Sequence, residues 1–188
     1  MQRKESYLLS VVVPMYYEEL VARECHSRLT SALSGLNYEL VYVNDGSKDR
    51  TLDILREIAQ EDPRARVVSF SRNFGHQAAV TAGVNYACGD CIVIIDADLQ
   101  DPPELIPDMI ELWKQGYDVV YAKRSKRKGE SAFKKLTAKV FYRTLAMLTD
   151  TQIPTDTGDF RLIDRKVAEA FKSMGEHSRF IRGMVAWL

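Results

Sequence analysis

Cysteine is scarce in this chain, which has three in 188 residues: Cys25, Cys88 and Cys91. An odd and small number of cysteines argues against a framework of disulfide bonds. Cys88 and Cys91 form a C-x-x-C pair, but no second pair accompanies them, so we interpret both as structural thiols rather than as a zinc or redox site. The three histidines show no metal-ligand spacing either, and we interpret His76 as a loop or packing residue.

The sequence also lacks an excess of either charge and lacks a long apolar run. Lys and Arg together number 26, as do Asp and Glu, and this balance gives no support to nucleic-acid binding. No apolar segment approaches the length that spans a bilayer, and residues 1–6 are too polar and too few for a signal peptide. The composition, 46% hydrophobic and 28% charged, predicts a soluble globular domain. A homo-oligomer is compatible with it.

What the chain does have is a regular alternation of two patterns. Helical spacing of apolar residues follows each of the first four predicted strands, and the third helix, around residues 78–87, is rich in small residues that should pack closely on a sheet. This alternation predicts an α/β fold with a mostly parallel central sheet, helices on both faces and right-handed crossovers. No repeat or linker divides residues 1–188, so we expect a single domain. The predicted strands are 8–13, 38–43, 67–70, 91–96 and 117–122.

Polar residues gather where the predicted strands end. Asp96 and Asp98 close the fourth apolar run, and on a strand their side chains would share one face. Two close carboxylates repel each other unless a cation lies beside them, and with the amide of Gln100 they suit Mg²⁺ or Mn²⁺. Taken alone, these residues fit a solvated turn equally well. Ligands of open parallel sheets bind beyond the carboxyl ends of the strands, however, so we predict a functional site at this edge. The other strand-end segments are 14–18, 45–47 and 71–75.

Several nucleotide-binding motifs are missing. A dinucleotide-binding domain would carry G-x-G-x-x-G after its first strand, where this chain has Pro14-Met15-Tyr16-Tyr17-Glu18. No Gly-Lys-Ser/Thr follows a glycine-rich turn, which excludes a P-loop. A phosphatase with an Asp nucleophile would be expected to have its Asp-x-Asp near the start of the chain. A nucleotidyltransferase would normally offer a glycine-rich loop with Arg or Lys after the first strand.

Five segments in sequence order carry a resemblance to a known family. They are Val11–Pro14 with Glu18, Val43–Ser47 with Asp49 and Thr51, Ser71–Gln77, Asp96–Pro103, and Thr157–Leu162. Together they resemble the family-2 glycosyltransferases, most closely the polyprenyl-phosphate glycosyltransferases of the dolichol-phosphate mannose synthase and bactoprenol glucosyltransferase type. The resemblance covers nearly the whole chain. One departure is Tyr17, where the family usually has Asn.

The resemblance implies a GT-A (Rossmann-like) fold, a nucleotide-diphosphate sugar as donor and inversion at the anomeric carbon. Likeness to the bacterial members favours a uridine diphosphate sugar over a guanosine one. Asp98 and Gln100 would ligate Mg²⁺ or Mn²⁺, and the metal would stabilise the charge that develops on the leaving diphosphate. The residues that the resemblance assigns to nucleotide-sugar binding are Pro14, Tyr16, Glu18, Asp45, Asn73, Asp96 and Ala97.

Asp159 matches the acceptor-side carboxylate of the family, which is the usual candidate for a catalytic base. A lipid monophosphate acceptor has a second pKa of about 6, so its attacking oxygen is largely ionised at neutral pH. Little proton removal is then required, and Asp159 is expected to position the acceptor or a cation beside it, such as Arg161. Without the resemblance, Asp159 fits a helix or turn cap after Gly158.

The only dense cationic run is residues 123–128, and an apolar stripe at helical spacing follows it. Segment 123–148 is typical of a basic amphipathic helix on an anionic membrane surface, although a helix that covers the domain would show a similar pattern. Arg124 and Arg127 are candidates to bind the phosphate of a lipid acceptor. Relatives of this subgroup commonly carry transmembrane helices after the catalytic domain, and this chain ends in an apolar stretch at Leu188. We therefore expect a catalytic domain cut from a longer protein that acts at the cytoplasmic face of the cell membrane.

These observations favour an inverting glycosyltransferase of cell-envelope polysaccharide synthesis, with a polyprenyl phosphate as acceptor. One alternative transfers the sugar to a hydroxyl group of a saccharide or lipid, which would require a true general base. A second alternative is a non-catalytic nucleotide-sugar-binding module at the membrane.

Overall fold

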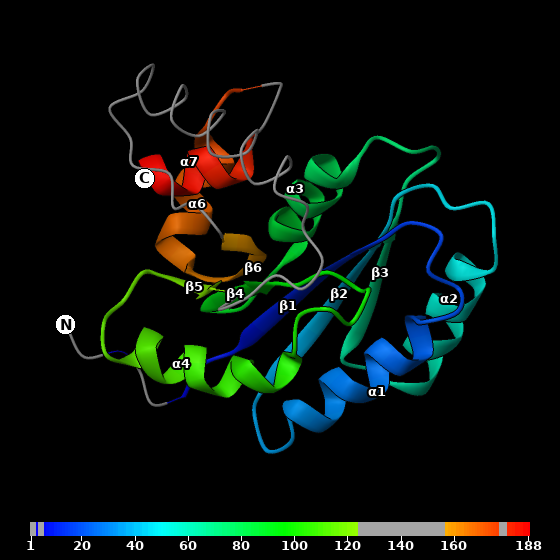
Figure 1. Ribbon diagram of the computed structural model, residues 1–188, viewed down its shortest axis with the longest axis horizontal. Coiled ribbons are helices and arrows are strands. Elements are labelled where there is room, and N and C mark those ends of the chain that lie inside the picture. Colours follow the sequence, from blue (N-terminus) through cyan, green and yellow to red (C-terminus); the bar gives the residue numbers. More distant parts are fainter. Residues whose placement is uncertain (1–2, 4–5, 124–156, 177–179) are drawn as a thin grey trace, which may run out of the picture.

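The structure, a computed structural model of the chain, describes residues 3, 6–123, 157–176 and 180–188. Within these residues a six-stranded sheet with the order β3-β2-β1-β4-β6-β5 runs through the middle of the molecule (Figure 1). Apart from Lys123, the predicted basic amphipathic segment 123–148 lies outside the described residues, and so do Arg124 and Arg127. What was predicted for them stays a prediction.

The first half of the sheet is parallel, as the sequence predicted. β1 pairs with β2 on one side and with β4 on the other, and β2 pairs with β3, always in the parallel sense. A helix follows each of β1, β2 and β3 and returns the chain to the start of the next strand. These elements are β1 (Leu9–Met15), α1 (Ala22–Ala32), β2 (Tyr38–Asn44), α2 (Thr51–Glu61), β3 (Ala65–Ser69), α3 (His76–Tyr86) and β4 (Cys91–Ile94).

The second half contains a strand that the sequence pattern did not predict. β6 (Thr157–Asp164) inserts between β4 and β5 and runs antiparallel to both. Phe160 and Leu162 belong to the hydrophobic core cluster on one face of the sheet, while Arg161 is buried on the other. The remaining elements are η1 (Pro103–Leu105), α4 (Ile106–Lys114), β5 (Val119–Lys123), α6 (Arg165–Ser173) and α7 (Ile181–Trp187).

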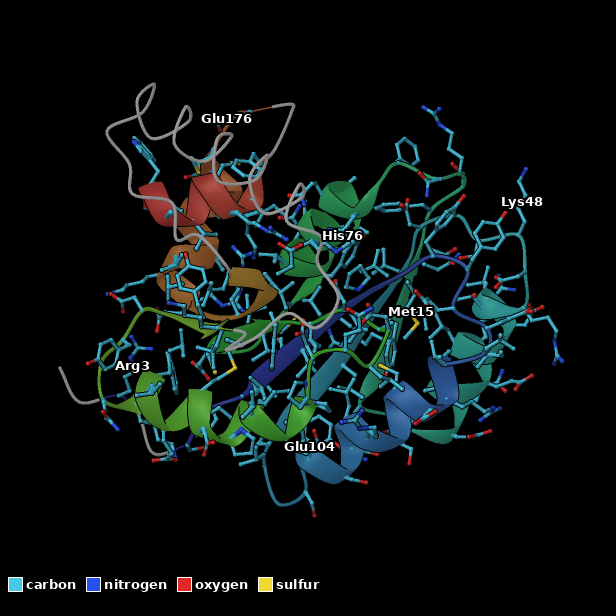
Figure 2. The ribbon with its side chains drawn as sticks, viewed as in Figure 1. Arg3, Met15, Lys48, His76, Glu104 and Glu176 are labelled. Atoms are coloured by element: carbon cyan, nitrogen blue, oxygen red, sulfur yellow. The ribbon has the colours of Figure 1, made fainter. Side chains whose placement is uncertain are left out.

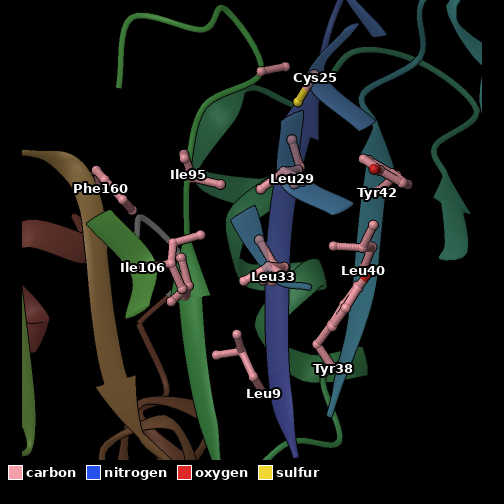
Figure 3. Close-up of a cluster of buried hydrophobic side chains, with 14 of the residues drawn as sticks. Leu9, Cys25, Leu29, Leu33, Tyr38, Leu40, Tyr42, Ile95, Ile106 and Phe160 are labelled. Carbon is pink, nitrogen blue, oxygen red and sulfur yellow. The ribbon is translucent and has the colours of Figure 1, made fainter. Parts of the chain in front are cut away.

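Two hydrophobic clusters cover the two faces of the sheet. Val11 and Val13 of β1 belong to the cluster that includes side chains of α1, α2 and α4, and Val12 belongs to the cluster of α3, α6 and α7. Figure 1 shows the two sets of helices on opposite sides of the sheet, and Figure 3 shows part of the first cluster. β1 is buried on both faces, which explains why its sequence is apolar at every position except Ser10 rather than alternating.

Helix α3 packs closely on the sheet because its packing face is made of small residues. A Cβ atom placed on Gly83 would overlap Cγ1 of Val12, and Ala79 is fully buried one turn earlier. This confirms the expected close packing of the small-residue helix. It also fixes the first residue of α3, His76, at the edge where the parallel strands end.

Two of the three cysteines, Cys25 and Cys91, are buried, and Cys88 is exposed. All three are free thiols. Burial raises the pKa of Cys25 and of Cys91 to about 12, so neither thiol ionises at neutral pH. In the part of the chain that the structure describes, no helix is long and apolar enough to cross a membrane.

Candidate functional site

A pocket of about 290 Å³ opens beyond the carboxyl ends of β1 and β4. In the sheet, β1 lies between β2 and β4, and the strand order reverses direction at this point. Ligand sites of open α/β sheets form where the order reverses, beyond the carboxyl ends of the strands. Figure 2 shows Met15 at the end of β1 and His76 at the start of α3, and both residues line the pocket. The predicted residues that also line it are Pro14, Tyr16, Glu18, Asp45, Asn73, Asp96, Ala97 and Asp98.

The loop after β1 is held by side chains of the loop and helix that follow β2. The backbone N–H of Tyr17 donates to Oγ of Ser47 at 3.1 Å, and the N–H of Glu18 donates to Oγ1 of Thr51 at 2.9 Å. Tyr17 has a φ of 59°, in the left-handed region. These bonds turn the chain so that Tyr16 and Glu18 both line the pocket.

Asp45, which ends the second strand motif, holds the loop after β3. Its carboxylate accepts hydrogen bonds from Nδ2 of Asn73 at 3.0 Å and from the backbone N–H groups of Phe74 at 2.7 Å and Gly75 at 2.9 Å. The side chain is nearly fully buried. Its neighbour Gly46 has a φ of 67°, and a Cβ atom there would overlap the backbone of Arg72, so the two loops touch. Asp45 and Asn73 therefore shape one wall of the pocket together.

The two carboxylates after β4 lie in a turn and not on the strand, which corrects one expectation. The strand ends at Ile94, so Asp96 and Asp98 do not share a strand face, although both line the pocket. Oδ1 of Asp98 accepts the backbone N–H of Gln100 at 3.0 Å, and Leu99 between them has a φ of 60°. The side chain of Gln100 is not among those that line the pocket.

The acidic residues of the pocket fit a divalent cation. Burial raises the pKa of Glu18, and the negative charges of Asp98, Asp49 and Asp96 raise it further. A carboxyl group whose pKa is raised by neighbouring carboxylates lies in a region of excess negative charge, which a bound cation would relieve. The donors are hard oxygen atoms, and such atoms suit Mg²⁺ or Mn²⁺.

A second group of charged residues lies beside the pocket, around Asp159 on β6. The antiparallel pairing ends with Ile94 opposite Arg161, and just beyond it carboxylate oxygens of Asp96 and Asp159 lie within 4.8 Å of each other. The two carboxylates are joined through His76. Its Nε2 lies 2.9 Å from Oδ1 of Asp96, and its Nδ1 lies 4.0 Å from Oδ2 of Asp159.

Two arginines bind the carboxylate of Asp159. Nη2 of Arg161 donates to Oδ1 at 2.9 Å, and Arg182 of α7 donates from Nε to Oδ1 at 2.8 Å and from Nη2 to Oδ2 at 3.0 Å. The exposed fraction of the side chain is 1% for Arg161, 13% for Asp159 and 29% for Arg182. Arg161 is thus enclosed by protein, while Arg182 forms the solvent side of the group.

These contacts set the protonation of the group. Burial alone would raise the pKa of Asp159, but the hydrogen bond and charge of Arg182 and the charges of Arg161 and His76 outweigh it, so the pKa lies below its ordinary value. The hydrogen bond to Asp96 raises the pKa of His76 despite partial burial. Asp159 is therefore a stable carboxylate and a weak proton acceptor at neutral pH.

His76, Asp96 and Asp159 have ligand atoms within 4.8 Å of one another, which is close enough for a metal ion. Two guanidinium groups already bind the oxygens of Asp159, however, and their charge would repel a cation at this position. The group is therefore better described as an ion-pair network than as a metal centre. The acidic wall with Asp98 is the better place for a cation.

Sequence reasoning missed two residues of this arrangement. His76 was interpreted as a loop or packing residue, whereas it lines the pocket and binds Asp96. Its place at a predicted strand end was the signal that could have identified it. No such signal marked Arg182, because its partner Asp159 lies far away in the sequence and β6 was not predicted.

Comparison with known proteins shows extensive similarity. The sequence model of a family described as "Glycosyl transferase family 2" matches residues 10–171. An uncharacterized glycosyltransferase of Bacillus subtilis, YkcC, is 60% identical over 181 residues, which are 95% of this chain and 56% of that protein. A prophage bactoprenol glucosyl transferase homolog of Escherichia coli is 41% identical over 182 residues, or 96% of this chain and 60% of that protein. The chain thus spans less than two thirds of the length of these relatives.

Solved structures share the fold at lower sequence identity. A mannosyltransferase from Pyrobaculum calidifontis, solved in complex with GDP-Man and Mn²⁺, matches with a TM-score of 0.64 and 22% identity over 89% of this chain and 47% of its own. Glucosyl-3-phosphoglycerate synthase from Mycobacterium tuberculosis, solved with Mn²⁺, UDP and phosphoglyceric acid, matches with a TM-score of 0.63 and 23% identity, over 86% and 57% of the two chains. The expected GT-A fold is confirmed.

Proposed function

The chain belongs to glycosyl transferase family 2, and from this we propose that it transfers a sugar from a nucleoside diphosphate sugar to a polyprenyl phosphate. The relatives named as bactoprenol glucosyl transferases support this acceptor class. The donor is proposed to be a uridine diphosphate sugar. UDP is bound in a structure with the same fold, and GDP-mannose in another, so the identity of the base is part of the test.

The observation that carries the choice of acceptor is the state of Asp159. Transfer to a hydroxyl group needs a base that accepts a proton, and a carboxylate bound by two arginines, with a lowered pKa, is poorly suited to this task. A phosphate monoester has a second pKa of about 6 and arrives largely ionised at neutral pH. The ion pairs of Asp159 therefore favour a phosphate acceptor over the alternative hydroxyl acceptor.

The donor is proposed to occupy the pocket beyond β1 and β4. Pro14, Tyr16 and Glu18 would lie along the nucleoside, and Asp45 with Asn73 would shape the wall beside the base or ribose. The backbone at Asp96 and Ala97 would face the sugar and its diphosphate.

The metal is proposed to bind at Asp98 and Gln100, where the oxygen donors fit Mg²⁺ or Mn²⁺. A bound cation of this kind stabilises the negative charge that develops on the leaving diphosphate. The solved relatives of the same fold were crystallised with Mn²⁺, which supports a divalent metal in this chain.

The transfer is a single displacement with balanced charges. An oxygen of the acceptor phosphate forms the bond to the anomeric carbon while the bond from that carbon to the diphosphate breaks, and the nucleoside diphosphate leaves with the electron pair. Attack from the opposite face inverts the anomeric centre. No proton has to move, because the attacking oxygen is already ionised.

The reaction is proposed to take place at the cytoplasmic face of the cell membrane, where a polyprenyl chain is anchored in the lipid. The basic amphipathic segment 123–148, with Arg124 and Arg127, is proposed to dock on this surface as one region of a single catalytic domain.

A panel of nucleotide sugars tests the proposal. The protein is incubated with each UDP- or GDP-sugar, Mg²⁺ or Mn²⁺, and undecaprenyl phosphate in membrane vesicles, and the lipid fraction is analysed by mass spectrometry. We expect one sugar to appear on the lipid phosphate, only when metal is present. Undecaprenol serves as the control acceptor. Absence of any glycolipid across the panel contradicts the proposal, and sugar transfer to undecaprenol would favour the hydroxyl acceptor.

A further inference from the structure

A bidentate ion pair joins the last helix to the site, and the proposed function does not explain it. Arg182 is the second residue of α7, and its guanidinium binds both carboxylate oxygens of Asp159. Helix α7 is anchored by the buried side chains of Ile181 and Met184 and by a hydrogen bond from the N–H of Ile181 to Oε1 of Gln77 on α3. Arg182 is thus presented from a packed helix, and its position is well defined.

We infer that Arg182 binds the phosphate of the acceptor and that Asp159, with Arg161 behind it, holds the guanidinium in position for this contact. The inference rests on the proposed function, because it names the residue that meets the proposed acceptor. Arg161 is thereby a positioning residue rather than a direct contact.

The charge of the group supports an anionic ligand. The group holds the guanidinium groups of Arg161 and Arg182, the carboxylates of Asp159 and Asp96, and His76, so it carries one positive charge in excess when His76 is protonated, the form that the hydrogen bond to Asp96 favours. The side chain of Arg161 is 1% exposed, so a ligand cannot reach it without displacing protein, whereas the side chain of Arg182 is 29% exposed. Any phosphate that approaches from solvent meets Arg182 first. Guanidinium groups bind phosphate oxygens with charge-assisted hydrogen bonds of good directionality.

The position of the group relative to the donor pocket supports the same conclusion. Asp159 and Asp96 have carboxylate oxygens within 4.8 Å of each other, and Asp96 lines the pocket. His76 contacts Asp96 and lies close to Asp159. A phosphate on Arg182 would therefore stand close to the donor side of the site, as a direct displacement requires.

The ion pair between Arg182 and Asp159 could instead serve only to hold α7 against β6. The two roles differ in what they change. A structural tie affects stability and every ligand alike, whereas a phosphate contact affects the acceptor and leaves the donor unchanged. The matched control is Arg28 of α1, whose Nε and Nη2 bind both oxygens of Glu104 in a similar pair outside the residues that line the pocket, with 34% of the side chain exposed.

The experiment compares Arg182→Ala, Arg182→Lys and Arg28→Ala with the wild-type chain. Binding of farnesyl phosphate, farnesol and inorganic phosphate is measured by calorimetry, and KM for undecaprenyl phosphate and for the donor is measured in the transfer assay. For Arg182→Ala we expect farnesyl phosphate affinity to fall, and KM for undecaprenyl phosphate to rise, by about tenfold to a hundredfold. Both values for Arg182→Lys should lie between those of Arg182→Ala and the wild type, because lysine keeps the positive charge but lacks the paired N–H donors of the guanidinium group.

The donor measurements and the control variant should show no change. KM for the donor should not change in the Arg182 variants, and Arg28→Ala should match the wild type in every assay. Wild-type acceptor affinity in Arg182→Ala overturns the inference, and so does an equal loss of donor and acceptor binding together with a lowered melting temperature. If inorganic phosphate binds the wild type as tightly as farnesyl phosphate does, the site is a simple anion site and the inference is also wrong.

Failure of the proposed function gives a different result. In that case the wild-type chain forms no glycolipid, although farnesyl phosphate still binds and Arg182→Ala still weakens it. Failure of the inference leaves wild-type glycolipid formation intact and removes the difference between Arg182→Ala and Arg28→Ala.

Discussion

Asp98 is the single residue on which the metal proposal depends most directly. It is exposed at the pocket, and one of its oxygens already accepts the N–H of Gln100, which fixes the side chain in the turn after β4. For Asp98→Ala we expect nucleotide affinity in the presence of Mn²⁺ to fall by about tenfold or more, and affinity without metal to stay the same. Calorimetric titration with UDP, with and without Mn²⁺, measures both.

The control for this variant is Asp108→Ala, an exposed carboxylate on α4 and outside the pocket. It should bind nucleotide as the wild type does. Metal-dependent binding that survives in Asp98→Ala would count against the assignment.

Asp159 should stabilise the protein only while its carboxylate is ionised. Its pKa is lower in the folded chain than the ordinary value of 3.8, so its ion pairs contribute fully above that value and are lost as the pH falls through the folded pKa. Asp159→Asn leaves the buried Arg161 without its charged partner, with only the backbone oxygens of Gly158 and Asp159 still bound, and should lower the free energy of unfolding by about 3 kcal/mol at neutral pH. The difference from the wild type should shrink as the pH falls below 3.8.

Urea unfolding of both proteins across this pH range measures the effect. Asp108→Asn, on the exposed face of α4, should show no comparable difference from the wild type at any pH. If the free energy of unfolding of Asp159→Asn is lower than that of the wild type by the same amount at every pH, the ion pairs are not the cause of the difference.

Tyr17 shows how a departure from the family pattern can be understood at the scale of one residue. The family usually has Asn at this position, and the backbone here has a φ of 59°. Asn adopts left-handed backbone more readily than other residues that carry a side chain, because its short amide can bond locally. The structure thus gives a conformational reason for Asn. Tyr17 keeps the same turn, held by Ser47, and packs its ring edge to face against Tyr16.

At the scale of elements, the position of His76 depends on how closely α3 packs on the sheet. Gly83→Ala should gain about 1 kcal/mol of helix propensity. The new Cβ overlaps Val12, however, and over-packing of a tight contact costs about 1–3 kcal/mol. We expect a net loss of stability and a weaker affinity for nucleotide, because the helix must move away from β1 and carry His76 with it.

Gly175→Ala is the matched control for this prediction. An added Cβ at Gly175 would meet no atom within 4 Å, and its φ is not in the left-handed region, so the same chemical change should be neutral or slightly stabilising. Thermal unfolding and UDP titration of both variants test the prediction. It is wrong if Gly83→Ala is as stable as Gly175→Ala.

Elements with local signals were predictable from the sequence, and β6 was not. The apolar runs of β1 and β4 predict buried strands, and Pro102-Pro103 predicts the start of the helical segment formed by η1 and α4. β6 mixes Asp159, Arg161 and Asp164 with its apolar residues, and its pairing with β4 spans many residues of sequence. Asp159 pairs locally with Arg161, but its contacts with Arg182 and His76 are tertiary contacts that no short window of sequence contains.

The same contrast holds for the whole molecule. The pocket beyond β1 and β4 was predictable because parallel strands bring their ends to one edge, and most of the residues expected there do line it. The charged group around Asp159 was only partly predictable, because Arg182 comes from α7 and depends on how the last part of the chain folds back over the sheet. The residues proposed to bind the donor are thus encoded near the strands, and those proposed to meet the acceptor are brought together by long-range packing.

The antiparallel course of β6 has a consequence for how the chain matures. Until residues 157–164 have been added, β4 is an edge strand whose outer N–H and C=O groups lack their neighbour, and such edges attract other chains. The segment that covers this edge also delivers Asp159 and Arg161 to the site. Pairing of β6 with β4 therefore both protects this edge of the sheet and brings Asp159 and Arg161 to the pocket, so the two events coincide in folding.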